Sequence, residues 1–177
     1  PWNEAIINAT SDDMLFSPRL EERQPASGTI TSSVDWQALY TRAKQDHLAQ
    51  CTNNRVHVND AYYAAHVQGR TREVEVHPLD ANRELRDFRG FLVYLQAMHA
   101  RPYFILQPLN PYVYTNLPEM DPTMEVIRGE LDRCGFPFLD MWVSDTSRFE
   151  PGTLTDVMHL GPLGWYKVDS ALAAYYP

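Results

Sequence analysis

Two residues near the end of the chain have types and a spacing that suit hydrolytic chemistry. Asp156 and His159 are separated by Val157 and Met158. In a turn-like loop both polar side chains can point the same way while the two apolar residues pack inward. The carboxylate can then accept a ring N–H of the histidine and fix its tautomer, which leaves the other ring nitrogen free to take a proton from a nucleophile. The alternative is that Asp156 caps a turn and His159 is a solvated loop residue.

No serine of the chain has the surroundings of a hydrolase nucleophile. The sequence contains no Gly-Asp-Ser and no Gly-x-Ser-x-Gly, the motifs that place a serine on a sharp turn behind a strand. The serines of the N-terminal segment lie in a stretch without apolar periodicity: Ser11, Ser17, Ser27, Ser32 and Ser33. We therefore assign no nucleophile and expect this chain alone to be inactive.

Four further residues could contribute to a site. Asn110 follows a short apolar run, where its amide could donate to an oxyanion or to a substrate group. It could equally be a turn residue beside the proline that follows it. Tyr112, Tyr114 and Trp165 could line an apolar-walled pocket, although aromatic side chains are more often part of a core. Both alternatives stay open for each residue.

The remaining histidines and the cysteines do not suggest a metal centre. No histidine has a ligand spacing such as His-Glu-x-x-His, and there is no Cys-x-x-Cys. Cys51 and Cys134 could pair in an oxidising compartment or remain free thiols. We predict no metal and no organic cofactor, and we expect surface or helix-end positions for the other histidines: His47, His57, His66, His77 and His99.

Composition limits the class of protein and its partners. A chain of 177 residues with 44% hydrophobic residues can bury one core, so one domain or part of one is expected. A net charge of -8 and the lack of a Lys/Arg run make nucleic acid an unsuitable partner. No run of about 18 apolar residues could span a bilayer. Because the chain opens at Pro1, we expect an anchor or signal to belong to a longer parent protein.

Helical and strand patterns alternate along the chain. We expect residues 1–33 to be irregular, residues 70–78 to form an edge strand or an extended loop, and Gly135 to end a helix. Helix, strand, helix, strand order indicates an α/β fold with a parallel sheet, with the chemistry at the carboxyl ends of the strands, in loops 107–117 and 143–161. The predicted helices are 34–50, 61–67, 82–101, 118–134 and 162–175, and the predicted strands are 103–106 and 138–142.

The final block resembles a known family. Asp156-x-x-His159 followed by Leu-Gly-x-x-Gly-Trp is similar to the last block of SGNH hydrolases, and more closely to that of the DltD family, the D-alanyl transfer proteins of teichoic acid D-alanylation. The resemblance runs from about residue 34 to 176. Other DltD-like segments occur in the same order: Asp35-Trp36-Gln37-Ala38-Leu39, Thr52-Asn53-Asn54, Asn59-Asp60-Ala61-Tyr62-Tyr63, Glu84 with Asp87-Phe88, and Gln107-Pro108-Leu109-Asn110.

This resemblance implies a flavodoxin-like, three-layer, SGNH-hydrolase-type parallel sheet. Residues 34–177 would be the C-terminal portion of a single domain that lacks its first strand, the one carrying the nucleophilic serine. His159 would be the base and Asp156 its orienting acid. Because a sheet without its central strand exposes pairing edges, we expect association with the rest of the protein or with another copy of the chain.

The function implied is D-alanyl ester transfer or hydrolysis on a cell-envelope polymer, at the extracytoplasmic face of a membrane to which an N-terminal helix anchors the parent protein. Its partners would be a D-alanyl donor, either a carrier protein or an acylated lipid or polymer, and a membrane acyltransferase. Two alternatives remain. One is a non-catalytic binding module that docks the carrier protein or the acyltransferase. The other is a generic SGNH esterase that removes acyl groups from polysaccharide.

Overall fold

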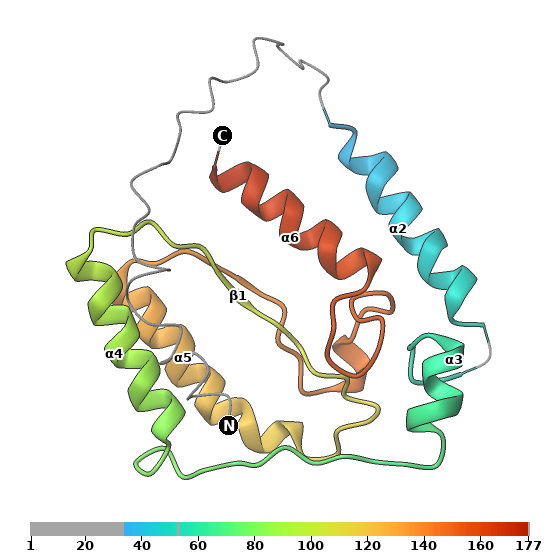
Figure 1. The fold of residues 1–177 in the computed structure, drawn as a ribbon, viewed down its shortest axis with the longest axis horizontal. Coiled ribbons are helices and arrows are strands. Elements are labelled where there is room, and N and C mark those ends of the chain that lie inside the picture. Colours follow the sequence, from blue (N-terminus) through green and yellow to red (C-terminus); the bar gives the residue numbers. More distant parts are fainter. Residues whose placement is uncertain (1–33, 53, 177) are drawn as a thin grey trace, which may run out of the picture. The chain divides into compact units, whose positions relative to one another are not determined.

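The structure is a computed structural model that describes residues 34–52 and 54–176. From Asp35 onward these residues belong to one structural unit, shown in Figure 1. The segment 1–33, predicted to be irregular, lies outside the described residues. The serines of that segment lie outside the described residues as well.

Polar caps begin the helices of the N-terminal half. The side chain of Asp35 accepts the Ala38 N–H at 2.9 Å, and helix α2 follows as Trp36–Gln50. Asn59 caps α3, Asp60–Tyr62, by accepting the N–H groups of its first turn. A π-helical turn, η1, continues it as Tyr63–Val67. Side-chain oxygens satisfy N–H groups that the first helical turn leaves without a partner, so both predicted helices are confirmed.

Helix α4, Arg83–Ala97, begins where predicted and ends earlier than predicted. Its cap is Asn82, whose side chain accepts the Leu85 N–H at 2.8 Å. The predicted end at residue 101 was wrong because His99 adopts a left-handed conformation, with φ at 51°, and turns the chain out of the helix. Histidine adopts this conformation more readily than most residues do, but sequence alone rarely signals it.

Two short strands form a parallel pair. β1, Phe104–Leu106, pairs with β2, Phe138–Asp140, in the register Phe104 with Phe138 and Leu106 with Asp140. This parallel pairing confirms an α/β class with a parallel sheet. The sheet has two strands within the described residues, and a three-layer SGNH arrangement stays a prediction. The segment 70–78 is extended and makes only an isolated bridge, Arg72 with Tyr114, so the loop alternative was the correct one.

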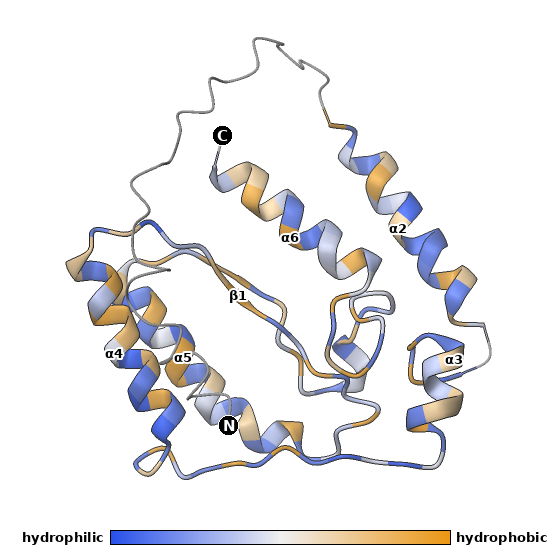
Figure 2. Ribbon diagram, viewed as in Figure 1, coloured by the Kyte–Doolittle hydropathy of each residue, from blue (hydrophilic) through white to orange (hydrophobic). Residues whose placement is uncertain are grey.

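The crossover between the strands contains two helical elements. A 3-10 turn, η2, covers Leu117–Met120, and helix α5 follows as Asp121–Cys134. Gly135 ends α5 in a left-handed conformation, with φ at 69°, as predicted. Leu92, Leu117 and Leu131 are fully buried and bring α4, η2 and α5 into one hydrophobic core. Figure 2 shows hydrophobic residues along the strands and hydrophilic residues interspersed along α2 and α4.

The last helix, α6, Pro162–Tyr175, has the predicted bounds and packs along α2 (Figure 1). The Tyr166 ring meets the ring of Trp36 edge-on at a centroid distance of 6.0 Å and that of Tyr40 at 5.4 Å. Before α6, a 3-10 turn, η3, covers Thr146–Arg148. Aromatic pairs at these distances add to the burial energy of the helix pair.

Glu150 joins the same two helices through charge. Its carboxylate lies 3.1 Å from Lys44 Nζ on α2 and 2.8 Å from Lys167 Nζ on α6. Burial by itself raises the pKa of Glu150, but the hydrogen bonds from Lys167 and Lys44 outweigh burial and hold that pKa below its usual value near 4.5. The ionised form is therefore the one that the fold stabilises.

We predict that Glu150→Gln lowers the free energy of unfolding at pH 7 by about 0.5 kcal/mol, a small value because solvent screens this partly exposed group. In the wild type, the stability from Glu150 is complete above the usual pKa and is lost as the pH falls through the lowered one. The difference between variant and wild type, measured by urea unfolding, should therefore disappear in acid. Glu125→Gln on α5 is the control and should match the wild type throughout; a pH-independent difference for Glu150→Gln would contradict the assignment.

Candidate functional site

A closed loop presents the two residues of the candidate dyad. Leu154 and Leu160 form an antiparallel bridge, in which the Thr155 N–H donates to the His159 carbonyl at 2.9 Å. Leu154 and Val157 are fully buried and anchor the loop in the interior. The prediction that Met158 packs inward was wrong, because its side chain is 39% exposed. The tight turn sends neighbouring side chains in different directions.

Asp156 holds the loop and the histidine together. Its Oδ1 accepts the N–H groups of Met158 and His159, both at 2.8 Å, and its Oδ2 lies 2.7 Å from His159 Nδ1. Burial alone raises the pKa of Asp156, but the two backbone donors and the His159 ring together lower it below its ordinary value. An ionised Asp156 favours the tautomer with hydrogen on Nδ1, so Nε2 is the nitrogen left to accept a proton.

The His159 side chain is 71% exposed, whereas the Asp156 side chain is 16% exposed. Among residues 34–52 and 54–176, Nε2 has no hydrogen-bond partner. The dyad thus combines a largely buried carboxylate with an exposed imidazole. Sequence spacing predicted this pairing, and the structure brings the two side chains together.

Three neighbouring segments position the dyad loop. The Gln107 side-chain amide donates to the Met158 carbonyl, and the Asn110 N–H donates to the Val157 carbonyl at 3.0 Å. From the other side, the Asn59 N–H donates to the Thr155 carbonyl at 2.9 Å. Gln107 directly follows β1, so the dyad loop lies at the carboxyl end of that strand. This is the edge at which open α/β sheets carry their chemistry.

Asn110 is fully buried, and its side chain forms hydrogen bonds that hold two loops in place. Its amide donates to the Val56 carbonyl at 2.8 Å, and its side-chain oxygen accepts the Tyr112 N–H at 2.9 Å. These are the bonds of a turn residue that also braces a second loop. An oxyanion contact by Asn110 stays a prediction.

The three candidate pocket aromatics lie in different environments. Tyr114 belongs to the hydrophobic core and is 8% exposed. Tyr112 is partly exposed, and its ring meets those of His57 and Phe149 edge-on. Trp165 lies on α6 in a hollow that α2 also lines. They do not share one pocket wall in the described structure, and a lining role for any of them stays a prediction.

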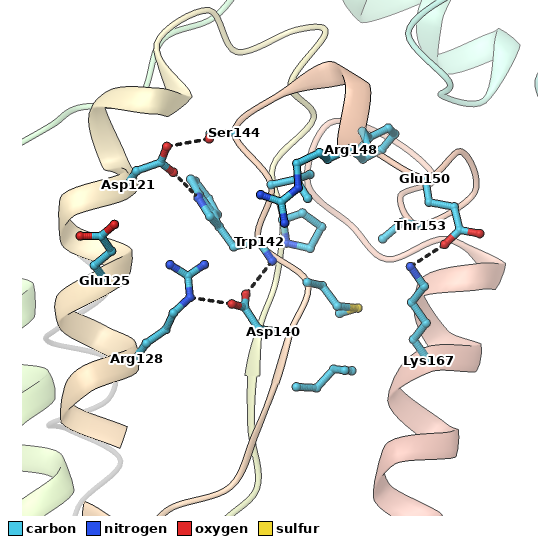
Figure 3. A pocket seen from close by; sticks show the side chains of 15 residues that line it. Asp121, Glu125, Arg128, Asp140, Trp142, Ser144, Arg148, Glu150, Thr153 and Lys167 are labelled. Carbon is cyan, nitrogen blue, oxygen red and sulfur yellow. Dashed lines mark hydrogen bonds and ion pairs between the residues drawn. The ribbon is translucent and has the colours of Figure 1, made fainter. Parts of the chain in front are cut away.

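A cavity of 680 Å³ lies beyond the carboxyl end of β2, between α5 and α6 (Figure 3). Its charges are largely paired: Arg128 lies 2.6 Å from Asp140, and Glu150 lies 2.8 Å from Lys167. The Thr153 hydroxyl, which has no hydrogen-bond partner within the described chain, also reaches its wall. Neither residue of the dyad lines this cavity. Sequence reasoning missed it, because its walls come from separate helices and a strand.

Comparison with known proteins decides the family. A family model described as DltD protein matches residues 6–177, nearly the whole chain. This chain belongs to the DltD family. No curated protein matches it significantly. Membership implies involvement in teichoic acid D-alanylation, and the DltD family is extracytoplasmic and membrane-associated. Among the residues that the structure describes, none forms a helix of the length and apolarity needed to cross a bilayer.

One histidine cluster of this DltD-family chain lies at the end of α2. His47 was expected at a surface or helix end; it lies in the last turn of α2, in agreement with the helix-end alternative, and it is buried, with 6% of the residue exposed. It lies with Cys51 and His57 in a group whose potential ligand atoms are all within 4.8 Å of one another. Cys51 and Cys134 are both free thiols. The missed signal was the spacing His-x3-Cys, which places two side chains on one face of a helix end.

Two glycines let α6 lie close to the dyad loop in this member of the DltD family. A Cβ on Gly161 would lie 2.6 Å from the Gly152 carbonyl oxygen. A Cβ on Gly164 would collide with the Thr153 carbonyl oxygen and lie 2.9 Å from Leu160 Cδ2. Backbone atoms cannot yield as a flexible side chain can. Glycine at these positions therefore allows α6 to pack at short distance against the dyad loop.

We predict that Gly164→Ala lowers the free energy of unfolding by about 1–3 kcal/mol, the usual cost of overpacking. The matched control is Gly129→Ala in α5, where an added Cβ meets nothing within 4 Å. That change should stabilise the chain by about 0.5–1 kcal/mol, because alanine favours a helix interior. Urea unfolding of both variants is the measurement, and changes of the same sign would contradict the packing assignment.

Proposed function

We propose that Asp156 and His159 are the acid and base of a serine-type acyl-transfer site that acts on D-alanyl esters of a cell-envelope polymer. The nucleophile in this proposal is a serine outside the described residues. The observation that carries the proposal is the 2.7 Å contact of His159 Nδ1 with Asp156 Oδ2, combined with an open Nε2. Family membership supports the substrate class, because the DltD family implies a role in D-alanylation.

The proposed chemistry uses each ring nitrogen once. Nε2 of His159 takes the serine proton as the serine oxygen attacks the D-alanyl carbonyl carbon, and Asp156 stabilises the imidazolium through Nδ1–H. The bond to the donor then breaks, and His159 returns the proton to the leaving oxygen or sulfur. An acceptor hydroxyl gives D-alanyl transfer by the reverse sequence, and water gives hydrolysis. D-alanyl transfer and hydrolysis differ only in the acceptor. A generic SGNH esterase acting on polysaccharide would use the same dyad on a different acyl group.

A binding module is the second candidate, and an exposed apolar surface on α4 favours it. Phe91 and Tyr94 share one face of α4, the C-cap residue Met98 continues that face, and each of the three is at least half exposed. Apolar side chains gathered on one helix are typical of an interaction surface. The proposed occupant is a membrane acyltransferase or carrier protein of the D-alanylation reaction. This role needs neither Asp156 nor His159, so variants separate the two candidates.

We predict that, in a cell producing the full-length protein, His159→Ala and Asp156→Asn each lower the rate of D-alanyl transfer by about 100-fold or more, the contribution of general acid–base catalysis. The measurement is D-alanine released from the envelope polymer by mild base. Asp156→Asn should act by removing the charge that fixes the ring tautomer, with unchanged protein level. The control is His66→Ala, an exposed histidine on η1, which should retain the wild-type rate.

If both dyad variants retain full D-alanylation, the catalytic proposal is wrong. If they retain it while Tyr94→Asp on α4 removes it, the binding module is supported instead. Copurification of the acyltransferase with each variant completes the comparison. The dyad variants should still copurify, because their substitutions lie in a loop distant in sequence from α4.

We also predict that the purified 177-residue chain does not hydrolyse nitrophenyl acetate above the buffer rate, because no serine of the described chain accompanies the dyad. Release of nitrophenol is followed by absorbance. Turnover that His159→Ala abolishes would show that the chain holds a nucleophile of its own. Turnover unaffected by that variant would point to a site other than the dyad.

A further inference from the structure

We propose that His47, Cys51 and His57 form a site for a divalent transition ion of the zinc class. One ring nitrogen of each histidine and the Cys51 Sγ lie within 4.8 Å of one another. The proposed acyl-transfer chemistry uses none of these three residues. The inference therefore concerns a second site in the molecule.

The end of α2 supplies two of the three ligands. His47 and Cys51 are one helical turn apart, and the Cys51 N–H donates to the His47 carbonyl at 3.0 Å. Side chains four residues apart share one face of a helix. His47 is buried against Gly152, where an added Cβ would lie 3.1 Å from the His47 Cβ. Within the described chain, the His47 ring makes no hydrogen bond, so its nitrogens are available to a ligand.

The third ligand, His57, lies in the segment after α2, and hydrogen bonds hold that segment in place. The Asp60 carboxylate accepts the N–H and hydroxyl of Thr52 at 2.9 and 2.7 Å and the amide of Asn54 at 2.8 Å. The Asn54 amide also donates to the Val58 carbonyl at 2.8 Å. These bonds hold residues 54–58, which carry His57, against Thr52 and Asp60 without help from a metal. Preorganised ligands bind an ion with a smaller loss of conformational entropy.

His57 has a left-handed backbone, with φ at 58°. Such a conformation in a residue other than glycine costs on the order of 1–2 kcal/mol and often marks a functional position. Here it directs the ring toward His47, with a centroid distance of 6.5 Å. The Tyr112 ring, with its centroid 5.2 Å from that of His57, supports the other side. The strained residue is thus held in the cluster from two sides.

The donor set selects the class of ion. Two imidazole nitrogens and one thiolate suit zinc and its neighbours, whereas magnesium and calcium require oxygen ligands. Bonds of about 2.0 Å to nitrogen and about 2.3 Å to sulfur place tetrahedral ligands about 3.3–3.5 Å apart, so modest side-chain rotation would close the cluster. As the Cys51 sulfur bonds to the ion, its thiol proton passes to solvent. Three protein ligands leave a fourth position for water.

An ion at this site would clip α2 to the turn that carries His57. That turn is also held by Asn110, which binds the Val56 carbonyl and, through its own N–H, the Val157 carbonyl of the dyad loop. Binding should therefore stabilise the part of the fold that supports the dyad. A ligand that binds only the folded state raises its stability in proportion to the logarithm of ligand excess.

The test uses the complete 177-residue chain, reduced and with any affinity tag removed. We expect Zn²⁺ to bind at one ion per chain in calorimetry and to raise the unfolding temperature, with no effect of Mg²⁺. Co²⁺ should give a thiolate-to-metal absorption band in the near ultraviolet. Cys51→Ser should abolish that band and weaken Zn²⁺ binding by at least about 10-fold, since even residues that only support metal ligands contribute that much.

Two control substitutions match the ligand substitutions. Cys134→Ser alters the other free thiol, and His99→Asn alters the other described histidine with a left-handed backbone. Both controls should bind Zn²⁺ as the wild type does. His57→Asn should lose at least about 10-fold in affinity while keeping the fold, since asparagine tolerates this conformation; it answers the question even if Cys51→Ser fails to fold. Absence of Zn²⁺ binding in the folded wild type, or binding unchanged in Cys51→Ser and His57→Asn, overturns the proposal.

Discussion

The hydrogen bonds of Asn110 are the interactions on which the arrangement of the site depends. This residue is fully buried and bonds to three loops. Its side-chain amide donates to the Val56 carbonyl, its side-chain oxygen accepts the Tyr112 N–H, and its backbone N–H donates to the Val157 carbonyl. An unpaired amide in this position would cost about 1–3 kcal/mol for each group left unsatisfied. The loops are therefore bound to one another more firmly than their irregular backbone suggests.

A second constraint is the close approach of α6 to the loop that precedes it. Gly161 and Gly164 allow backbone to lie against backbone, and Glu150 joins α2 to α6 through Lys44 and Lys167. The final helix thus packs closely against the dyad loop, and the His159 side chain lies on the exposed side of that loop.

Local sequence patterns predicted the helices and strands well. Features that depend on long-range contacts were predicted poorly. The bounds of α6 and the cap at Gly135 followed from proline and glycine chemistry that acts within a few residues. The Asp156 and His159 pair was also found, because three-residue spacing in a turn suffices to join them. The early end of α4 was missed, since a left-handed His99 has no strong sequence signal.

The features that the sequence did not reveal combine residues distant along the chain. The cavity beyond β2 needs α5, β2 and α6 in place before its walls exist. The burial of His47 depends on the approach of Gly152, about a hundred residues later. The exposure of Met158 depended on a turn geometry that gives the backbone N–H of that residue to Asp156. Tertiary packing decides these outcomes, and periodicity carries no information about it.

The three bonds that Asp156 accepts have a mechanical consequence for His159. The carboxylate cannot rotate without losing two backbone donors, so the imidazole is pinned at its Nδ1 corner while the rest of the ring stands in solvent. The covalent bond at Cγ and the contact at Nδ1 hold the same edge of the ring, so Nε2 lies on the opposite edge, away from Asp156. Nε2 therefore stays accessible to any group that approaches the exposed side of the ring.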